Sequence, residues 1–132
     1  MPVWLERRDI DFFYEELMSE FGGLPGPPKE DAPAATLARP QNQLGYEPSS
    51  SLYDLAASYG FGFARNHCFP DGNKRIALAA TDIFLSLNAI DLVPDEAEAV
   101  VIVNALASGE YSQEDLAEWL ENNSTGLDAG DN

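Results

Sequence analysis

The spacing of apolar residues is the feature that most restricts how this chain can fold. Apolar side chains recur at steps of three and four positions, which is the repeat of one face of an α-helix. No stretch of convincing length alternates apolar and polar residues, and there is no internal repeat or heptad run. The sequence therefore predicts an all-α fold of about six helices. Two stretches show the pattern most clearly: Ile10, Phe13, Leu17 and Phe21, and later Ile76, Ala80, Ile83, Phe84 and Leu87.

Local signals at the ends of these stretches predict where each helix begins and ends. Glycine and proline mark stops, whereas serine marks starts because its hydroxyl accepts a hydrogen bond from a first-turn N–H group. We expect a first helix ending at Gly22 and Gly23, a loop over 24–33, a short helix over 34–39 stopped by Pro40, and a loop over 41–48. A helix capped by Ser50 or Ser51 should follow, then a loop over 66–72 and after it the central and most apolar helix. Pro94 should open the next helix, which ends at Gly109, and Ser112 should cap the last one.

Length and composition fit one cytoplasmic domain. With 132 residues, 45% of them hydrophobic, the chain can form one core and has no room for a second. A single cysteine and a single histidine exclude the common zinc frameworks, which need about four such ligands. No apolar run approaches the roughly 20 residues of a membrane-spanning helix. We expect one domain over 1–125, a disordered acidic tail over 126–132, and no association with membranes.

The charge distribution points to a small anionic ligand. The net charge is −16, so the surface as a whole repels phosphate backbones, and direct binding of nucleic acid is not expected. Against this background, Arg65, Lys74 and Arg75 lie within eleven residues of one another, together with His67. Such a window is suited to hold an anion in an otherwise negative molecule.

The residues inside this window have the chemistry of phosphoryl or nucleotidyl transfer. The loop leads into a helix that begins near Asn73, where unpaired N–H groups favour an anion, and Gly72 lets backbone approach it closely. Lys74 and Arg75 add positive charge and donors, and Asp71 offers the hard oxygen ligand that Mg²⁺ prefers. His67 is the candidate general base, because an imidazole side chain can accept a proton from an attacking hydroxyl near neutral pH.

The same window resembles the signature of the Fic/Doc family, in the form found in its Doc branch. The likeness covers roughly residues 13–120, and the all-α fold of the family agrees with the helical pattern. The resemblance implies that His67 activates the hydroxyl of the target, that Phe69 anchors the loop in the core, and that Asp71 orients Mg²⁺. It assigns phosphate or nucleotide binding to Asn73, Lys74 and Arg75, beside Gly72, whose backbone is expected to approach the same anion. The residues that carry the likeness are His67-Cys68-Phe69-Pro70-Asp71-Gly72-Asn73-Lys74-Arg75, with similar flanks at 21–26, 37–42 and 84–88.

Lys74 distinguishes the two branches of the family. Fic-type enzymes have glycine there and transfer AMP from ATP, whereas lysine in the Doc branch accompanies a reversed nucleotide pose and transfer of the γ-phosphate. The resemblance therefore implies a Doc-type toxin, an ATP- and Mg²⁺-dependent protein kinase. It would act on a serine or threonine hydroxyl of a translation factor similar to elongation factor Tu, and a Phd-like antitoxin would restrain it.

Two alternatives remain open at this stage. Gly72 is a Fic-like residue, which favours AMP transfer to protein, and a non-catalytic protein that binds nucleotide or antitoxin would keep the same motif. The chain departs from the common pattern at Cys68, where proline is frequent, and at Ile76, where threonine is frequent. No internal inhibitory helix of the kind found in some Fic proteins is present, so restraint is expected from a separate partner.

Overall fold

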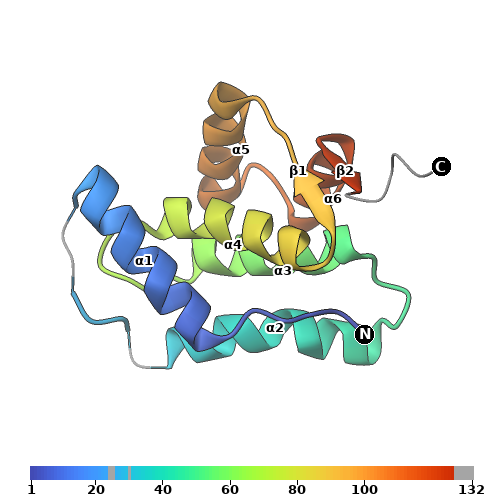
Figure 1. The fold of residues 1–132 in the computed structure, drawn as a ribbon, viewed down its shortest axis with the longest axis horizontal. Helices are drawn as coiled ribbons and strands as arrows, with labels where there is room; N and C mark the ends of the chain where they lie inside the picture. Colours follow the sequence, from blue (N-terminus) through green and yellow to red (C-terminus); the bar gives the residue numbers. More distant parts are fainter. Residues whose placement is uncertain (24–25, 30, 127–132) are drawn as a thin grey trace.

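Two adjacent helices form the centre of the protein. The computed structural model describes residues 1–23, 26–29 and 31–126. Helices α3 (Leu52–Arg65) and α4 (Asn73–Leu87) run together through the middle, α2 (Ala32–Tyr46) lies along one side of them, and α1 (Arg7–Phe21) crosses at one end (Figure 1). Helices α5 (Glu96–Ser108) and α6 (Gln113–Asn122) cover the opposite side. The predicted fold class, all-α with six helices, is confirmed for the described residues.

Gly60 explains how α3 can lie so close to its neighbours. A Cβ atom at this position would be 2.7 Å from Thr81 Cγ2 on α4 and 2.9 Å from Leu116 Cδ2 on α6. Glycine within a helix costs about 1 kcal/mol relative to alanine. Here that cost is offset by close packing around a helix in which Leu55, Tyr59 and Phe63 are almost completely buried.

Helix α2 differs from the sequence prediction. A short helix over 34–39 ending at Pro40 and a loop over 41–48 were expected, but one helix runs from Ala32 to Tyr46 with Pro40 inside it. Proline within a helix removes one hydrogen bond and costs about 3 kcal/mol. The helix continues because Leu37 and Pro40 are buried where α2 packs against α3, a tertiary effect that helix-stop rules do not contain.

The other helix ends mostly follow their local signals. Ser51 and Ser112 cap α3 and α6, each accepting a hydrogen bond from the N–H three residues later, and Gly109 ends α5 with φ 88°. One detail is corrected, because Asp95 caps α5 through Glu98 N–H and Pro94 therefore precedes the cap.

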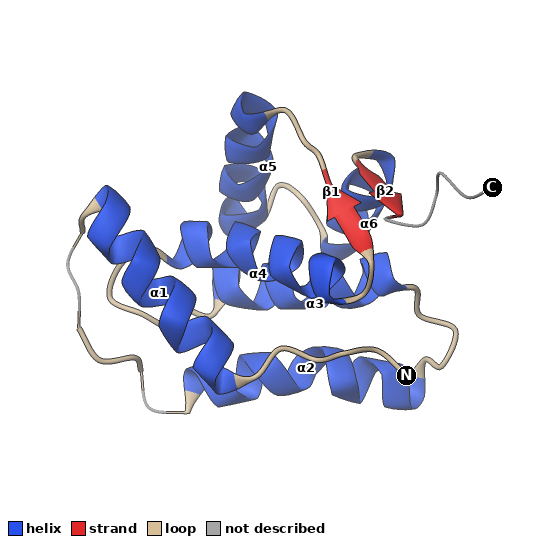
Figure 2. Ribbon diagram, viewed as in Figure 1, coloured by secondary structure: helices blue, strands red, loops and turns tan. Residues whose placement is uncertain are grey.

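A two-stranded sheet adds the only β-structure among the described residues. Strands β1 (Ile90–Leu92) and β2 (Ser124–Gly126) pair antiparallel, with Ile90 opposite Gly126 (Figure 2). Three-residue strands are too short to produce a recognisable alternation in sequence. Gly126 belongs to β2, so the expected tail does not begin there, and the rest of that prediction, 127–132, lies outside the described residues.

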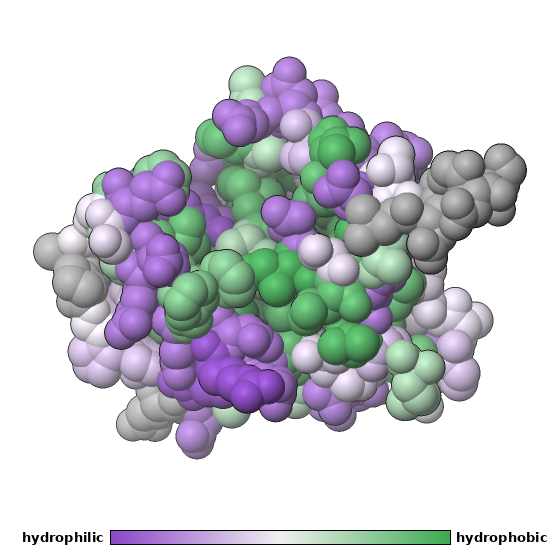
Figure 3. Space-filling view, viewed as in Figure 1, coloured by the Kyte–Doolittle hydropathy of each residue, from purple (hydrophilic) through white to green (hydrophobic). Residues whose placement is uncertain are grey.

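The surface is mixed in character. Figure 3 shows hydrophilic side chains over α1 and apolar side chains gathered in the middle of the same face. In the part of the chain that the structure describes, no helix is both long enough and apolar enough to cross a membrane.

Candidate active site

The loop between α3 and α4 carries the motif, and its centre is anchored in the core. The side chain of Phe69 is 4% exposed, and its ring stacks on Tyr14 of α1 with the ring centroids 4.1 Å apart. The expected burial of Phe69 is therefore observed. Burial raises the pKa of the Tyr14 phenol, and the negative charge of Asp71 raises it further.

Cys68 also points inward. The side chain is completely buried, and its Sγ lies 3.4 Å from Thr36 Oγ1 of α2. Burial raises the pKa of the thiol, which keeps it protonated at neutral pH. His67 beside it is exposed and has a positive φ of 48°. The loop therefore has a buried centre, Cys68 and Phe69, between exposed residues on both sides.

Asn73 ties the centre of this loop to the start of α4. Its Oδ1 accepts a hydrogen bond from Phe69 N–H at 3.0 Å, and its Nδ2 donates one to Phe69 O at 2.8 Å. The Asn73 side chain thus closes the loop over the four residues that precede α4. Its predicted role in phosphate binding would have to come from its backbone or from further contacts of the same amide.

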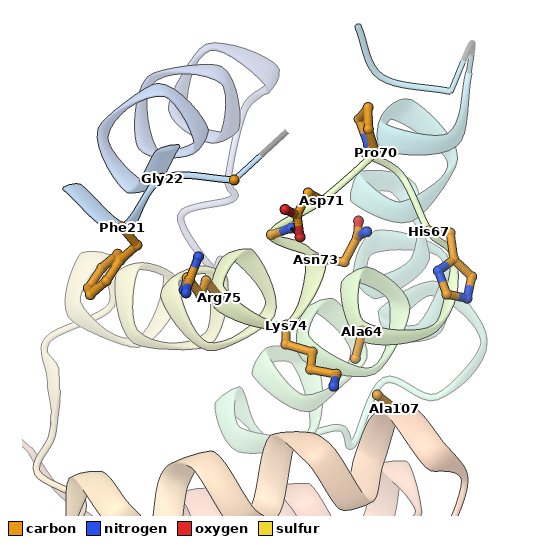
Figure 4. Close-up of a pocket in the computed structure, with 12 residues that line it drawn as sticks. Phe21, Gly22, Ala64, His67, Pro70, Asp71, Asn73, Lys74, Arg75 and Ala107 are labelled. Atoms are coloured by element: carbon orange, nitrogen blue, oxygen red, sulfur yellow. Dashed lines mark hydrogen bonds between the residues drawn. The ribbon is translucent and has the colours of Figure 1, made fainter. Parts of the chain in front are cut away.

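A cavity of about 470 Å³ opens above this loop, which is a typical size for a small-ligand site. The ends of α1 and α5 stand on either side of it, at Phe21 and Ala107, and the start of α4 forms its floor (Figure 4). Apart from the buried Phe69, all the site residues predicted from the motif line the cavity: His67, Asp71, Gly72, Asn73, Lys74 and Arg75.

Gly72 forms the turn into α4 and brings backbone to the cavity. It occupies the N-cap with φ 80° in the left-handed region, and a Cβ there would be 2.5 Å from Met18 Cε. The unpaired N–H groups of the first turn of α4 and the positive end of its dipole therefore face the cavity, a favourable arrangement for an anion.

Asp71 is the carboxylate that lines the cavity. Its Oδ1 accepts a hydrogen bond from Gly72 N–H at 2.8 Å, and its Oδ2 lies against the backbone of Gly23, where a Cβ would be only 2.8 Å away. The described residues contain no cluster of three or more metal-ligating side chains. A single carboxylate beside a phosphate cradle nevertheless fits Mg²⁺, which is commonly held by one or two carboxylates and by the phosphates of its nucleotide.

The two cationic side chains of the motif reach different walls. Arg75 extends toward α1, where its Cζ lies 4.8 Å from the centroid of the Phe21 ring. Lys74 extends toward Ala64 and Ala107 on the opposite side (Figure 4). An anion in the cavity would therefore have positive charge on both sides.

Two other arginines considered from the sequence do not line the cavity. Arg39 connects three helices, since it donates hydrogen bonds to Ser58 O and to Gln113 Oε1, and its Cζ lies 5.3 Å from the Phe61 ring. Arg65 is exposed and approaches the same ring. Both fit a structural role on the described surface.

The sequence reasoning missed the walls of the cavity. The end of α1 supplies Phe21, Gly22 and Gly23, and α5 supplies Ala107. The first segment was noticed as the end of the first helix and as a family-like flank, without a role in the site, and nothing in the sequence marked Ala107.

Comparison with known proteins identifies the family. The sequence profile described as Fic/DOC family matches residues 4–85. Protein kinase doc of Escherichia phage P1 is 34% identical over 103 residues, which are 78% of this chain and 81% of the phage protein. The chain belongs to the Fic/Doc family. Within the family, Toxin Doc of Mycolicibacterium smegmatis (strain ATCC 700084 / mc(2)155) is 44% identical over 62 residues, 46% of this chain and 48% of that protein.

These findings confirm the family that the motif predicted. The two relatives are named as a protein kinase and as a toxin, and both names contain Doc, which favours the Doc branch. The roles of the individual motif residues stay predictions.

Proposed function

We propose that the protein is a Doc-type toxin that acts as an ATP-dependent protein kinase. The observation that carries this proposal is the cavity at the start of α4. It is lined by a candidate base, His67, by a candidate metal ligand, Asp71, and by two cations on opposite walls. Base, metal ligand and phosphate cradle are the parts that phosphoryl transfer requires. The kinase activity named for the phage P1 relative supports the same reading.

The proposed step is transfer of the γ-phosphate to a serine or threonine hydroxyl. His67 accepts the proton of that hydroxyl while its oxygen forms a bond to the γ-phosphorus, and the bond from this phosphorus to the β–γ bridging oxygen breaks. ADP leaves with the electron pair of the broken bond. Lys74, Arg75 and the first-turn N–H groups of α4 hold the phosphates, and Gly72 permits their approach.

Asp71 is the proposed Mg²⁺ ligand. Bound Mg²⁺ would neutralise charge on the phosphates as the leaving group departs. Hydrogen bonding from Gly72 N–H and the close backbone of Gly23 fix the direction of the Asp71 carboxylate, which lines the cavity wall. Phe69 contributes by anchoring the loop through its stack on Tyr14.

The proposed biological setting rests on the resemblance to Doc-type toxins, and one relative is named Toxin Doc. We infer that residues 1–125 act as one cytoplasmic domain, that the phosphorylated protein is a translation factor similar to elongation factor Tu, and that a Phd-like antitoxin restrains the toxin. The strongly acidic surface supports a protein substrate over nucleic acid.

Transfer of AMP is the second candidate, and Gly72 favours it as a Fic-like residue. Lys74 opposes it, because a long cationic side chain occupies space on the wall near Ala64 and Ala107 that is open when glycine stands there. A binding protein without turnover is the third candidate, and the complete set of motif side chains in one cavity speaks against it.

Two labelled nucleotides separate these candidates. The protein is incubated with Mg²⁺, bacterial lysate and ATP labelled at either the γ- or the α-phosphate, beside a His67→Ala control. We expect a protein band labelled from the γ-phosphate alone, and no band with the control. Label from the α-phosphate alone would replace the kinase proposal with AMP transfer, and γ-label that persists in His67→Ala would refute the role of the base.

A further inference from the structure

Phe21 has an unusual position for a phenylalanine. It is the last residue of α1 and its side chain is 54% exposed, so it adds little to the core. Instead it lines the cavity wall, and its ring lies beneath the guanidinium of Arg75 at 4.8 Å (Figure 4). A cation this close to a ring centroid is attracted to the negative face of the ring.

Such a contact matters for Arg75 because its side chain has no ion pair among the residues that the structure describes. It is exposed, and the salt bridges found among the described residues involve only Arg7 and Arg8. A free arginine side chain samples many rotamers, and fixing it on binding an anion costs up to about 2 kcal/mol of conformational entropy. A ring that holds the guanidinium beforehand reduces this cost.

The end of α1 is itself fixed to the motif loop. Met18 lies close enough to Gly72 that a Cβ there would be 2.5 Å from its Cε, and Gly23 approaches Asp71 in the same way. One turn earlier, Tyr14 stacks on Phe69. The Phe21 ring is therefore held in a defined place relative to the floor of the cavity.

We propose that Phe21 is a positioning residue, whose ring holds the Arg75 guanidinium in place for a triphosphate. This inference rests on the proposed function, since it takes Arg75 as a phosphate-binding residue. Phe21 acts through Arg75 and makes no contact with the reacting atoms.

Binding of AMP-PNP, an ATP analogue that resists hydrolysis, tests this inference by titration calorimetry in the presence of Mg²⁺. Phe21→Leu is expected to weaken binding about two- to fivefold, the range for an exposed cation–π contact. Phe21→Tyr keeps an aromatic ring and should bind like the wild type. The matched control is Phe12→Leu, because Phe12 lies on the same helix, is 55% exposed and does not line the cavity.

A double-mutant cycle decides whether Phe21 acts through Arg75. If it does, Phe21→Leu has no further effect once Arg75 is alanine. In the labelling assay, Phe21→Leu should raise KM for ATP about two- to fivefold and leave kcat within about twofold of the wild type. A loss of affinity that persists in the Arg75→Ala background, or that Phe21→Tyr does not restore, would overturn the positioning role.

Failure of the proposed function has a different signature. A wild type that does not bind the analogue refutes the nucleotide site itself, and the inference about Phe21 with it. A wild type that binds, with Phe21→Leu binding equally well, refutes only the role of Phe21. Because Phe21 is exposed, Phe21→Leu should fold, and a thermal unfolding curve within about 2 °C of that of the wild type verifies this.

Discussion

Replacing Asn73 with alanine tests whether the motif asparagine holds the loop even without a ligand. Its amide makes two hydrogen bonds, both to the backbone of Phe69, whose side chain is almost completely buried. In Asn73→Ala both are lost at once, and Phe69 N–H and Phe69 O lose these partners. The substitution should therefore lower the free energy of unfolding of the protein without nucleotide.

The magnitude follows from these two contacts. Each intramolecular hydrogen bond contributes about 0.5–1.5 kcal/mol, and a buried backbone group without a partner costs about 1–3 kcal/mol. Partial access of water to the loop reduces the second cost, so about 2–3 kcal/mol in total is expected. For a chain of 132 residues this corresponds to a decrease in Tm of roughly 6–12 °C.

Thermal unfolding of the nucleotide-free protein, followed by circular dichroism, measures this effect. Lys74→Ala is the matched control, because the neighbouring side chain is exposed and should leave the Tm within about 2 °C of the wild type. Asn73→Asp keeps an acceptor for Phe69 N–H and loses the donor to Phe69 O, so it should fall between the wild type and Asn73→Ala. If Asn73→Ala unfolds at the wild-type temperature and differs only in nucleotide affinity, the loop-holding role is wrong.

Three further substitutions address other parts of the structure. Gly72→Ala places a Cβ 2.5 Å from Met18 Cε at a φ of 80°, so it should lower stability by about 1–3 kcal/mol in urea unfolding, and adding Met18→Ala should recover only part of the loss. Burial raises the pKa of Tyr59 to about 12 from its ordinary 10.0, so its stabilising contribution is complete below pH 10 and is lost as pH rises to 12. In urea unfolding, the free energy of unfolding of the wild type should therefore fall by about 2–3 kcal/mol more than that of Tyr59→Phe between pH 9 and 12. An equal dependence of this free energy on pH in the two proteins would contradict the prediction. Lys74→Gly should increase transfer of α-phosphate label relative to γ-phosphate label, and an unchanged ratio would show that Lys74 does not select the phosphate.

Features encoded in a few neighbouring residues could be predicted from the sequence. The serine caps at Ser51 and Ser112 and the glycine stop at Gly109 depend on contacts within about four positions, so their signals are complete locally. The motif residues behave in the same way, because a tight loop followed directly by a helix start brings the residues from His67 to Arg75 close together without help from distant segments.

Features that depend on distant partners could not be predicted in this way. Pro40 looks like a helix stop, and only its burial against α3 explains why α2 continues through it. Similarly, no local pattern indicates that Tyr14 stacks on Phe69 or that Phe21 lies beneath Arg75, since these pairs are far apart in sequence. The sequence identifies the floor of the site, whereas the packing of α1 and α5 creates its walls.

The adjacency of Lys74 and Arg75 has a consequence that becomes visible only in three dimensions. Neighbouring positions on a helix point about 100° apart, so two successive cations at the start of α4 cannot both face one side of the cavity. Arg75 extends to Phe21 on α1, and Lys74 extends toward Ala107 on α5 (Figure 4). A single phosphate therefore contacts one of them closely, whereas a chain of phosphates lying across the first turn of α4 reaches both. In the proposed function, the direction of that chain would decide which phosphate lies toward His67, so this pair of cations is the place to test which group is transferred.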